Sequence, residues 1–230
     1  MGTRLLRRTG TATAIVVVAA ATMALAGGST TQLGGGVPPG SDGGALTFFV
    51  AEGDPRSGYR SSDSELAVWA LETWARQSPS AITLQPSPEP EAIVRLYWVP
   101  PDNSVFGEMR PLVVNGRQGA EVFVRADVDQ LEPELAARAR QDPLWRDTIV
   151  YLTCLHEFGH ALGLRHTADN RDIMYFFGYG GDVTEYFARY RRSIKSRADI
   201  ARTSGLSPAD VSRQRAVYGA GTLLQSRTRR

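Results

Sequence analysis

All three histidines of this chain fall within eleven consecutive positions, at His156, His160 and His166. Imidazole nitrogens are among the commonest protein ligands of zinc. His156 and His160 are four residues apart, so on a helix they share a face and can reach one metal ion. His166 lies six residues further on, where a straight helix would turn it away from that face. The chain must therefore leave the helix before His166 if the three rings are to meet.

Gly163 lies midway between the second and third histidines, in the pattern H-E-x-x-H-x-x-G-x-x-H. Glycine readily adopts the left-handed backbone conformation that ends a helix. The pattern thus supplies three ligands and the break that brings the third one round. Three neutral imidazoles with a fourth position open are typical of a catalytic zinc site. The alternative is three histidines satisfied separately in a core or on a surface, and their clustering argues against it.

Glu157 follows the first histidine and lies at the edge of the predicted metal face. A carboxylate there can take a proton from a zinc-activated water and later deliver it to the leaving amine. We therefore predict a zinc-dependent endopeptidase with Glu157 as general base. Two alternatives stay open. One is a secreted zinc-binding interaction module without peptidase activity, which would not need Glu157. The other is a zinc hydrolase of a non-protein amide, which would use the same chemistry.

Hydrophobic periodicity and turn residues predict the elements that must position this site. A helix is expected over 61–78, with Ser62 or Asp63 as its N-cap, and a second helix over 146–163, which carries the first two histidines. Asn115-Gly116 is a typical hairpin turn between two strand-like runs. The other expected elements are strands at 47–52, 81–85 and 92–99 and a short helix or turn at 133–141. Strands mixed with two long helices indicate an α+β or α/β layer arrangement.

The N-terminus has the pattern of an export signal. Residues 1–26 combine a basic start, an apolar run of about sixteen residues and a small-x-small site ending at Ala26. We predict cleavage after Ala26 and a secreted or extracytoplasmic protein, with no stable membrane span after cleavage. An uncleaved N-terminal anchor is the alternative, although the apolar run is short for a membrane span. Residues 27–45 are rich in Gly, Ser and Pro and predict a flexible linker.

Charge and cysteine content give fewer functional signals. The formal charge of +2 conceals an asymmetry, since residues 189–230 carry +9 and residues 27–188 carry −10. We interpret the basic end as a solvated helix face and a tail, and expect no nucleic-acid partner; an anionic partner is the alternative. Cys154 is the single cysteine, so no internal disulfide can form. Its apolar surroundings predict a small buried core residue.

The stretch "HEFGHALGLRH" resembles the zinc motif of the metzincin peptidases, and most closely their matrixin, or matrix-metalloproteinase-like, branch. Met174 follows His166 by eight residues, the spacing of the methionine turn that lies beneath the metal in matrixins. The stretch "LSPADVSRQRAVYG" at 206–219 resembles the last helix of a matrixin catalytic domain, and Ser207, Pro208 and Asp210 predict its N-cap, an N1 proline and an N3 acid. The resemblance extends over residues 46–220, and 221–230 is expected to be a basic tail.

The resemblance implies a zincin-like α+β fold. A twisted, mostly parallel sheet with two long helices, one of them the active-site helix, would form the larger lobe. A small C-terminal lobe after Gly163 would hold the methionine turn and the final helix. It also implies one catalytic zinc on His156, His160 and His166 and a protein or peptide substrate. Tyr175 would either line the specificity pocket or pack beside it.

Several features depart from the matrixin pattern. Phe176 stands where the turn usually has proline. No histidines remain for a second, structural zinc, so none is expected. Calcium is possible, since the family commonly binds it, but no ligands can be assigned; acids such as Asp127 and Asp129 are interpreted as surface charges. The residues between Ala26 and the first strand contain no cysteine, so no cysteine-switch propeptide is expected. Residues 178–205 form a longer connection, interpreted as an insertion with an added helix. The oligomeric state is left open.

Overall fold

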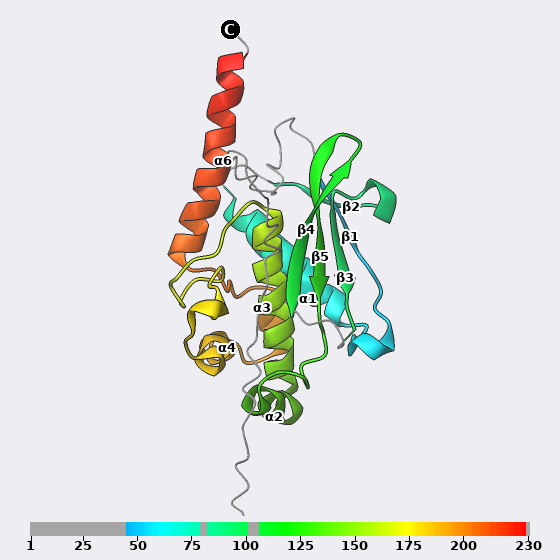
Figure 1. Cartoon of the computed structure of the whole chain (residues 1–230), viewed down its shortest axis with the longest axis vertical. Coiled ribbons are helices and arrows are strands. Elements are labelled where there is room, and N and C mark those ends of the chain that lie inside the picture. The colour runs from blue at the N-terminus through cyan, green and yellow to red at the C-terminus, as the bar shows by residue number, and fades with distance from the viewer. Residues whose placement is uncertain (1–44, 79–81, 101–105, 229–230) are drawn as a thin grey trace, which may run out of the picture.

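A computed structural model of the chain describes residues 45–78, 82–100 and 106–228. The predicted signal peptide of 1–26 and all but the last residue of the predicted linker lie outside this range. In the described part, a five-stranded sheet is covered on one face by helices, and further helices follow beyond them (Figure 1). None of the described helices has both the length and the apolar composition needed to cross a membrane.

The sheet is mostly parallel and has the strand order β2-β1-β3-β5-β4. Strands β1, β2, β3 and β5 run parallel, and β4 pairs antiparallel with β5 at one edge. The strands are β1 (Leu46–Val50), β2 (Leu84–Pro86), β3 (Val94–Trp98), β4 (Gly107–Val114) and β5 (Arg117–Val124). Asn115 and Gly116 connect β4 to β5 with φ of 51° and 76°. This confirms the predicted hairpin, because a type I′ turn requires positive φ at both residues.

The two faces of the sheet have different surroundings, and the side chains of β3 point alternately to one face and the other. Val94 and Leu96 are fully buried against the helices, because successive side chains of a strand point to opposite faces. On the other face Tyr97 lies between Phe49 and Phe123, with ring centroids 6.5 and 5.5 Å away. That face carries no helix among the described elements (Figure 1).

Two long helices, α1 (Asp63–Gln77) and α3 (Pro143–Ala161), pack against each other on the covered face. The indole nitrogen of Trp74 in α1 donates to the carbonyl of Leu155 in α3 over 2.8 Å. The remaining helices are α2 (Pro133–Gln141), α4 (Val183–Arg191), α5 (Arg197–Ile200) and α6 (Pro208–Thr228), with 3-10 turns η1 (Pro55–Ser57), η2 (Glu89–Glu91) and η3 (Phe177–Tyr179). The predicted α+β class, with a mostly parallel sheet and two long helices, is confirmed.

The first residues of two helices differ from the sequence prediction. Ser62 precedes α1 but makes no side-chain capping bond. Asp63 accepts from the amide of Arg60, and its carboxylate also pairs with Arg146 in α3. Helix α3 begins three residues earlier than predicted, because Asp142 caps it by accepting from the amide of Leu144 over 3.0 Å.

Helix α6 begins as predicted and continues further than predicted. The hydroxyl of Ser207 accepts from the amide of Asp210, and the carboxylate of Asp210 accepts from the amide of Ser207. This reciprocal pair satisfies two amides at the helix start, as in a capping box. The helix runs to Thr228, so most of the predicted tail of 221–230 is helical. The stretch 178–205 contributes α4 and α5, which lie beside α3 and before α6 (Figure 1).

Candidate metal centre

Three imidazole nitrogens converge on one point beside α3. Nε2 of His166 lies 3.2 Å from Nε2 of His156 and 3.1 Å from Nε2 of His160. In the described part of the chain, these residues form the one group of three or more His, Cys, Asp or Glu that could hold a metal ion. The three rings that the sequence predicted to be ligands are therefore brought together.

The turn at Gly163 brings His166 back to the helix. Gly163 has φ of 91°, and its amide donates to the carbonyl of His160. The amide of Leu164 donates to the carbonyl of Gly159 over 2.9 Å. These two bonds make a Schellman motif, which ends a helix with a left-handed residue, usually glycine. The predicted role of Gly163 as the helix break is thus what the backbone shows.

Backbone carbonyls fix which nitrogen of each helical histidine faces the centre. Nδ1 of His156 donates to the carbonyl of Ile173 over 2.7 Å, and Nδ1 of His160 donates to that of Leu164 over 2.9 Å. A carbonyl oxygen only accepts, so Nδ1 carries the proton in both rings. Each Nε2 then presents a lone pair to the other rings. Metal-ligating histidines are typically oriented by this kind of second bond.

Burial keeps these rings neutral. His156 and His160 are 4% and 8% exposed, and burial lowers the pKa of both, well below the usual value for His156. Burial, reinforced by His160, also lowers the pKa of His166 to about 4. Desolvation has this effect because it penalises the charged form of an imidazole. At neutral pH the three rings are therefore uncharged, and each has one nitrogen with a free lone pair.

The spacing of the three nitrogens fits zinc. Zn–N bonds of about 2.0–2.1 Å at tetrahedral angles place ligand nitrogens about 3.3 Å apart. Nε2 of His166 lies 3.1 and 3.2 Å from the Nε2 atoms of the other two rings, and the ligand atoms of all three rings lie within 4.8 Å of one another. With Nδ1 of both helical rings engaged elsewhere, His156 and His160 offer lone pairs rather than protons to each other. A cation between them would satisfy these lone pairs.

Glu157 lies next to the centre with an unsatisfied carboxylate. It is 1% exposed, and its Oε1 has no hydrogen-bond partner. A Cβ added at Gly107, the first residue of β4, would lie 2.4 Å from this Oε1, so glycine leaves room for the carboxylate. Burial, with a further contribution from Glu108, raises the pKa of Glu157 well above its usual value. Buried polar atoms normally have partners, so this one is ready to receive a proton donor.

Met174 packs beneath the histidine-bearing turn of α3. It is fully buried, and a Cβ added at Gly159 would lie 2.3 Å from its sulfur. Gly159 stands between the two helical ligands, so the absence of its side chain lets Met174 approach the helix there. The amide of Thr167 donates to the Met174 carbonyl over 2.8 Å, which ties the His166 segment to the methionine turn.

The carbonyl of Ile173 is held by groups that the sequence did not reveal as part of the site. The hydroxyl of Tyr186 in α4 donates to it over 3.0 Å, beside the bond from His156. The amide of Ile173 donates to the buried carboxylate of Asp210 over 2.8 Å. In the sequence, Asp210 is recognisable only as a helix cap, and Tyr186 only as an aromatic residue of the stretch 178–205. No local pattern signals either contact, because the partners lie 37 and 13 residues apart.

The two aromatic residues after Met174 have different surroundings. Tyr175 is 5% exposed, its hydroxyl donates to the carbonyl of Gly180, and its ring meets Phe177 edge to face. It therefore packs within the turn. Phe176 lies against His166 with ring centroids 4.8 Å apart, in the place where proline was expected.

Residues interpreted as structural are not part of this group of candidate ligands. Cys154 is buried and free, as predicted, and burial raises the pKa of its thiol well above the usual value. Asp129 is exposed and pairs with Arg140 over 2.9 Å. Nothing in these contacts tests the expectation of calcium.

A family model and several solved structures match this chain. The matrixin model of the peptidase M10 family matches residues 68–185, which include the motif and the methionine turn. No curated protein matches. Thirty chains of solved structures match. One, described as the crystal structure of myroilysin, is 19% identical, with 76% of this chain and 82% of that chain covered and a TM-score of 0.36.

Proposed function

Since the chain belongs to the matrixin family of zinc metallopeptidases, we propose that it is a secreted zinc endopeptidase with His156, His160 and His166 as metal ligands. The convergence of their three Nε2 atoms beside a buried, unsatisfied carboxylate carries this proposal. Three protein ligands would leave the fourth position of a tetrahedral zinc ion for water or substrate, as in catalytic zinc sites.

In the proposed reaction, a side chain of this protein supplies the acid–base chemistry beside the metal. When bound, zinc would lower the pKa of a water molecule at the open position and polarise the scissile carbonyl. Glu157 acts as general base: its Oε1 accepts a proton from the attacking water and then donates it to the leaving amine. Burial shifts the pKa of Glu157 upward from its usual acidic value, the direction in which a carboxylate becomes a stronger base.

The elements around the site hold it in position. The carbonyls of Ile173 and Leu164 orient His156 and His160, while Gly163 and Met174 position the returning segment that carries His166. We assign residues 46–220 to the catalytic domain, with 178–205 as an insertion within it.

Export rests on the pattern of residues 1–26. Mass measurement of the protein recovered from an exporting host should show a chain that begins at Gly27. A chain recovered outside the cytoplasm but still beginning at Met1 would support the anchored alternative.

Cleavage of unmodified peptides separates the proposal from its alternatives. Purified protein is incubated with a diverse peptide library, first zinc-loaded, then with a chelator, then with zinc restored. We expect internal cuts that stop with the chelator and return with zinc. A folded, zinc-loaded protein that cuts no peptide would contradict the proposal and favour a binding module or a hydrolase of another amide.

A further inference from the structure

A small apolar cavity lies directly beside Glu157. His156 and Glu157 form part of its wall, and aromatic side chains from η3 and α4 form another part. Its volume is about 20 Å³. A cavity needs roughly 10–15 Å³ to hold one water molecule. This space therefore admits a group about the size of a methyl or hydroxymethyl.

Three aromatic rings form one side of the cavity wall. Phe177 meets Tyr186 edge to face at 4.8 Å, and Tyr186 meets Phe187 edge to face at 5.2 Å. All three are less than 10% exposed. Close packing of this kind resists the entry of larger groups, because neighbouring rings must move together. Two of the three rings come from α4, which lies in the stretch 178–205.

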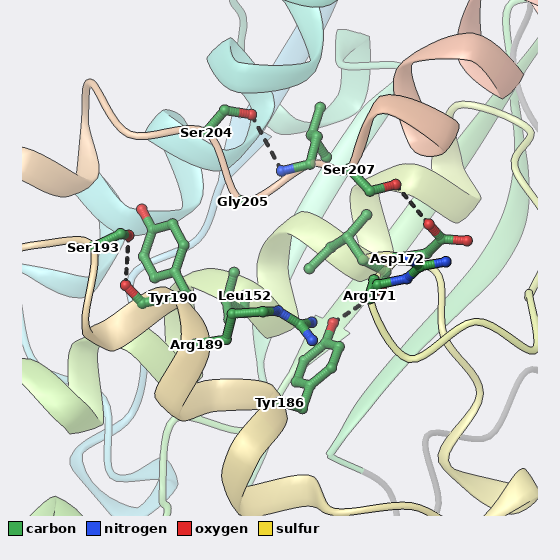
Figure 2. A pocket seen from close by; sticks show the side chains of 12 residues that line it. Leu152, Arg171, Asp172, Tyr186, Arg189, Tyr190, Ser193, Ser204, Gly205 and Ser207 are labelled. Carbon is green, nitrogen blue, oxygen red and sulfur yellow. Dashed lines mark hydrogen bonds between the residues drawn. The ribbon is translucent and has the colours of Figure 1, made fainter.

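The side chains between this cavity and a second, larger cavity are held in place. Tyr186 and Leu152 also line a second cavity of about 240 Å³ (Figure 2), so these two side chains lie between the two spaces. The hydroxyl of Tyr186 is fixed to the carbonyl of Ile173 over 3.0 Å. Rotating this ring away would break that bond. The larger cavity is therefore closed to a side chain that enters beside Glu157.

We propose that α4 makes this enzyme selective for a small residue, glycine, alanine or serine, at one of the two positions flanking the cleaved bond. The inference rests on the proposed function, since it requires Glu157 to act at that bond. A side chain that reaches a cavity walled by Glu157 and His156 must belong to a residue adjoining the bond, because the next residue lies a further 3.8 Å along the backbone.

Peptide-library cleavage with aligned cut sites measures this selectivity. The zinc-loaded protein should cut with glycine, alanine or serine at one flanking position, and should discriminate against leucine there. Each methylene beyond the fitting size should cost roughly 10- to 200-fold in kcat/KM. In Phe187→Ala and Phe177→Ala, the leucine-to-alanine ratio of kcat/KM should rise at least about tenfold.

Phe49→Ala is the matched control, because Phe49 packs beside Tyr97 and is not among the residues that line the cavity. Its cleavage profile should equal that of the unmodified protein. Equal cutting with small and large residues at both flanking positions, or an unchanged profile in both cavity variants, would overturn the selectivity alone. Absence of any cut would overturn the proposed function, and the selectivity with it.

Benzene binding reports on the cavity without peptidase activity, since enlarged apolar cavities bind benzene. Zinc-free Phe187→Ala should show saturable benzene binding by NMR, whereas the unmodified protein and Phe49→Ala should show none. Benzene binding to all three proteins would mean that the cavity is not closed and would overturn the inference. Phe187→Leu, which leaves a smaller space, replaces the alanine variant if that variant does not fold.

Discussion

Nδ1 of His156 lies 2.7 Å from the carbonyl oxygen of Ile173, the residue before the methionine turn's Met174. This bond connects the helix that carries the ligand to the loop beneath the metal centre. The same loop is anchored from its other side, because the Ile173 amide donates to Asp210 at the start of α6. The orientation of one ligand therefore depends on a residue 54 positions further along the chain.

Replacing Asp210 with alanine should weaken zinc binding. The change removes the acceptor of the Ile173 amide and frees the segment that orients His156. Partners that orient metal ligands are typically worth about 10- to 100-fold in metal affinity. Competition with a chromophoric chelator measures this affinity. Asp199→Ala, which removes an acidic cap at α5, serves as the control and should leave zinc affinity unchanged. Equal affinity in the Asp210→Ala variant would contradict the anchoring role.

The buried ion pair between α1 and α3 should be a major contributor to stability. Asp63 is fully buried and accepts from Arg146 over 2.8 Å, and the arginine also donates to the carbonyls of Gly58 and Ala126. Asp63→Ala leaves the buried Arg146 with only the more distant carboxylate of Asp147, 3.6 Å away, so the free energy of unfolding should fall by about 3 kcal/mol, the lower end of the cost of breaking a buried pair. Denaturant titration measures it.

An exposed pair provides the control for this change. Glu134 pairs with Arg138 one turn later in α2, with more than 45% of each side chain exposed. Exposed pairs of this kind contribute little, so Glu134→Ala should leave the unfolding midpoint nearly unchanged. A similar effect of both substitutions would contradict the importance assigned to burial.

The zinc-free protein should lose stability as the pH falls from about 6.5 toward 4. The lowered pKa values of His156, His160 and His166 mean that the unfolded chain, with histidine pKa near 6.5, binds protons more readily than the folded one. The contribution of these rings to the free energy of unfolding is complete above pH 6.5. It is lost as the pH falls through the pKa values of the folded rings. Glu157 acts in the opposite direction, because its raised pKa favours proton uptake by the folded protein.

Denaturation midpoints of the zinc-free protein at pH 7.5 and pH 5.0 test this balance, and the midpoint should be lower at pH 5.0. His166→Gln should reduce the difference, since it removes one titrating ring. Exposed acids with lowered pKa, such as Asp54 at about 2, lose their contribution only at lower pH. A midpoint that stays constant or rises between pH 7.5 and 5.0 would show that the histidines are not the dominant titrating groups.

The sequence was most informative where the structure depends on neighbouring residues. The spacing of His156, Gly163 and His166 predicted that the three rings converge and that the helix ends at the glycine, because a helical repeat and a left-handed glycine are local properties. The same holds for the Asn115-Gly116 hairpin and the cap formed by Ser207 and Asp210. These features need only a few consecutive residues to be specified.

Contacts between distant segments could not be predicted in this way. Asp63 was one of two residues expected to cap its helix, and its carboxylate pairs with Arg146, 83 residues away. The bond between Tyr186 and Ile173 and the closing of the cavity beside Glu157 depend on how α4 packs against α3. Periodicity identifies which face of a helix is buried, but not which side chains meet there.

The most direct test of the central claim compares the zinc-loaded protein with Glu157→Gln, which keeps the shape of the side chain and removes its ability to take up a proton. Zinc content and peptide cleavage are measured on the same preparations. The account predicts one zinc per chain in both proteins and a loss of kcat of about 100-fold or more in the variant, since general acid–base groups contribute roughly 10²–10⁴-fold. A fully zinc-loaded Glu157→Gln protein that cuts peptides at the unmodified rate would contradict it.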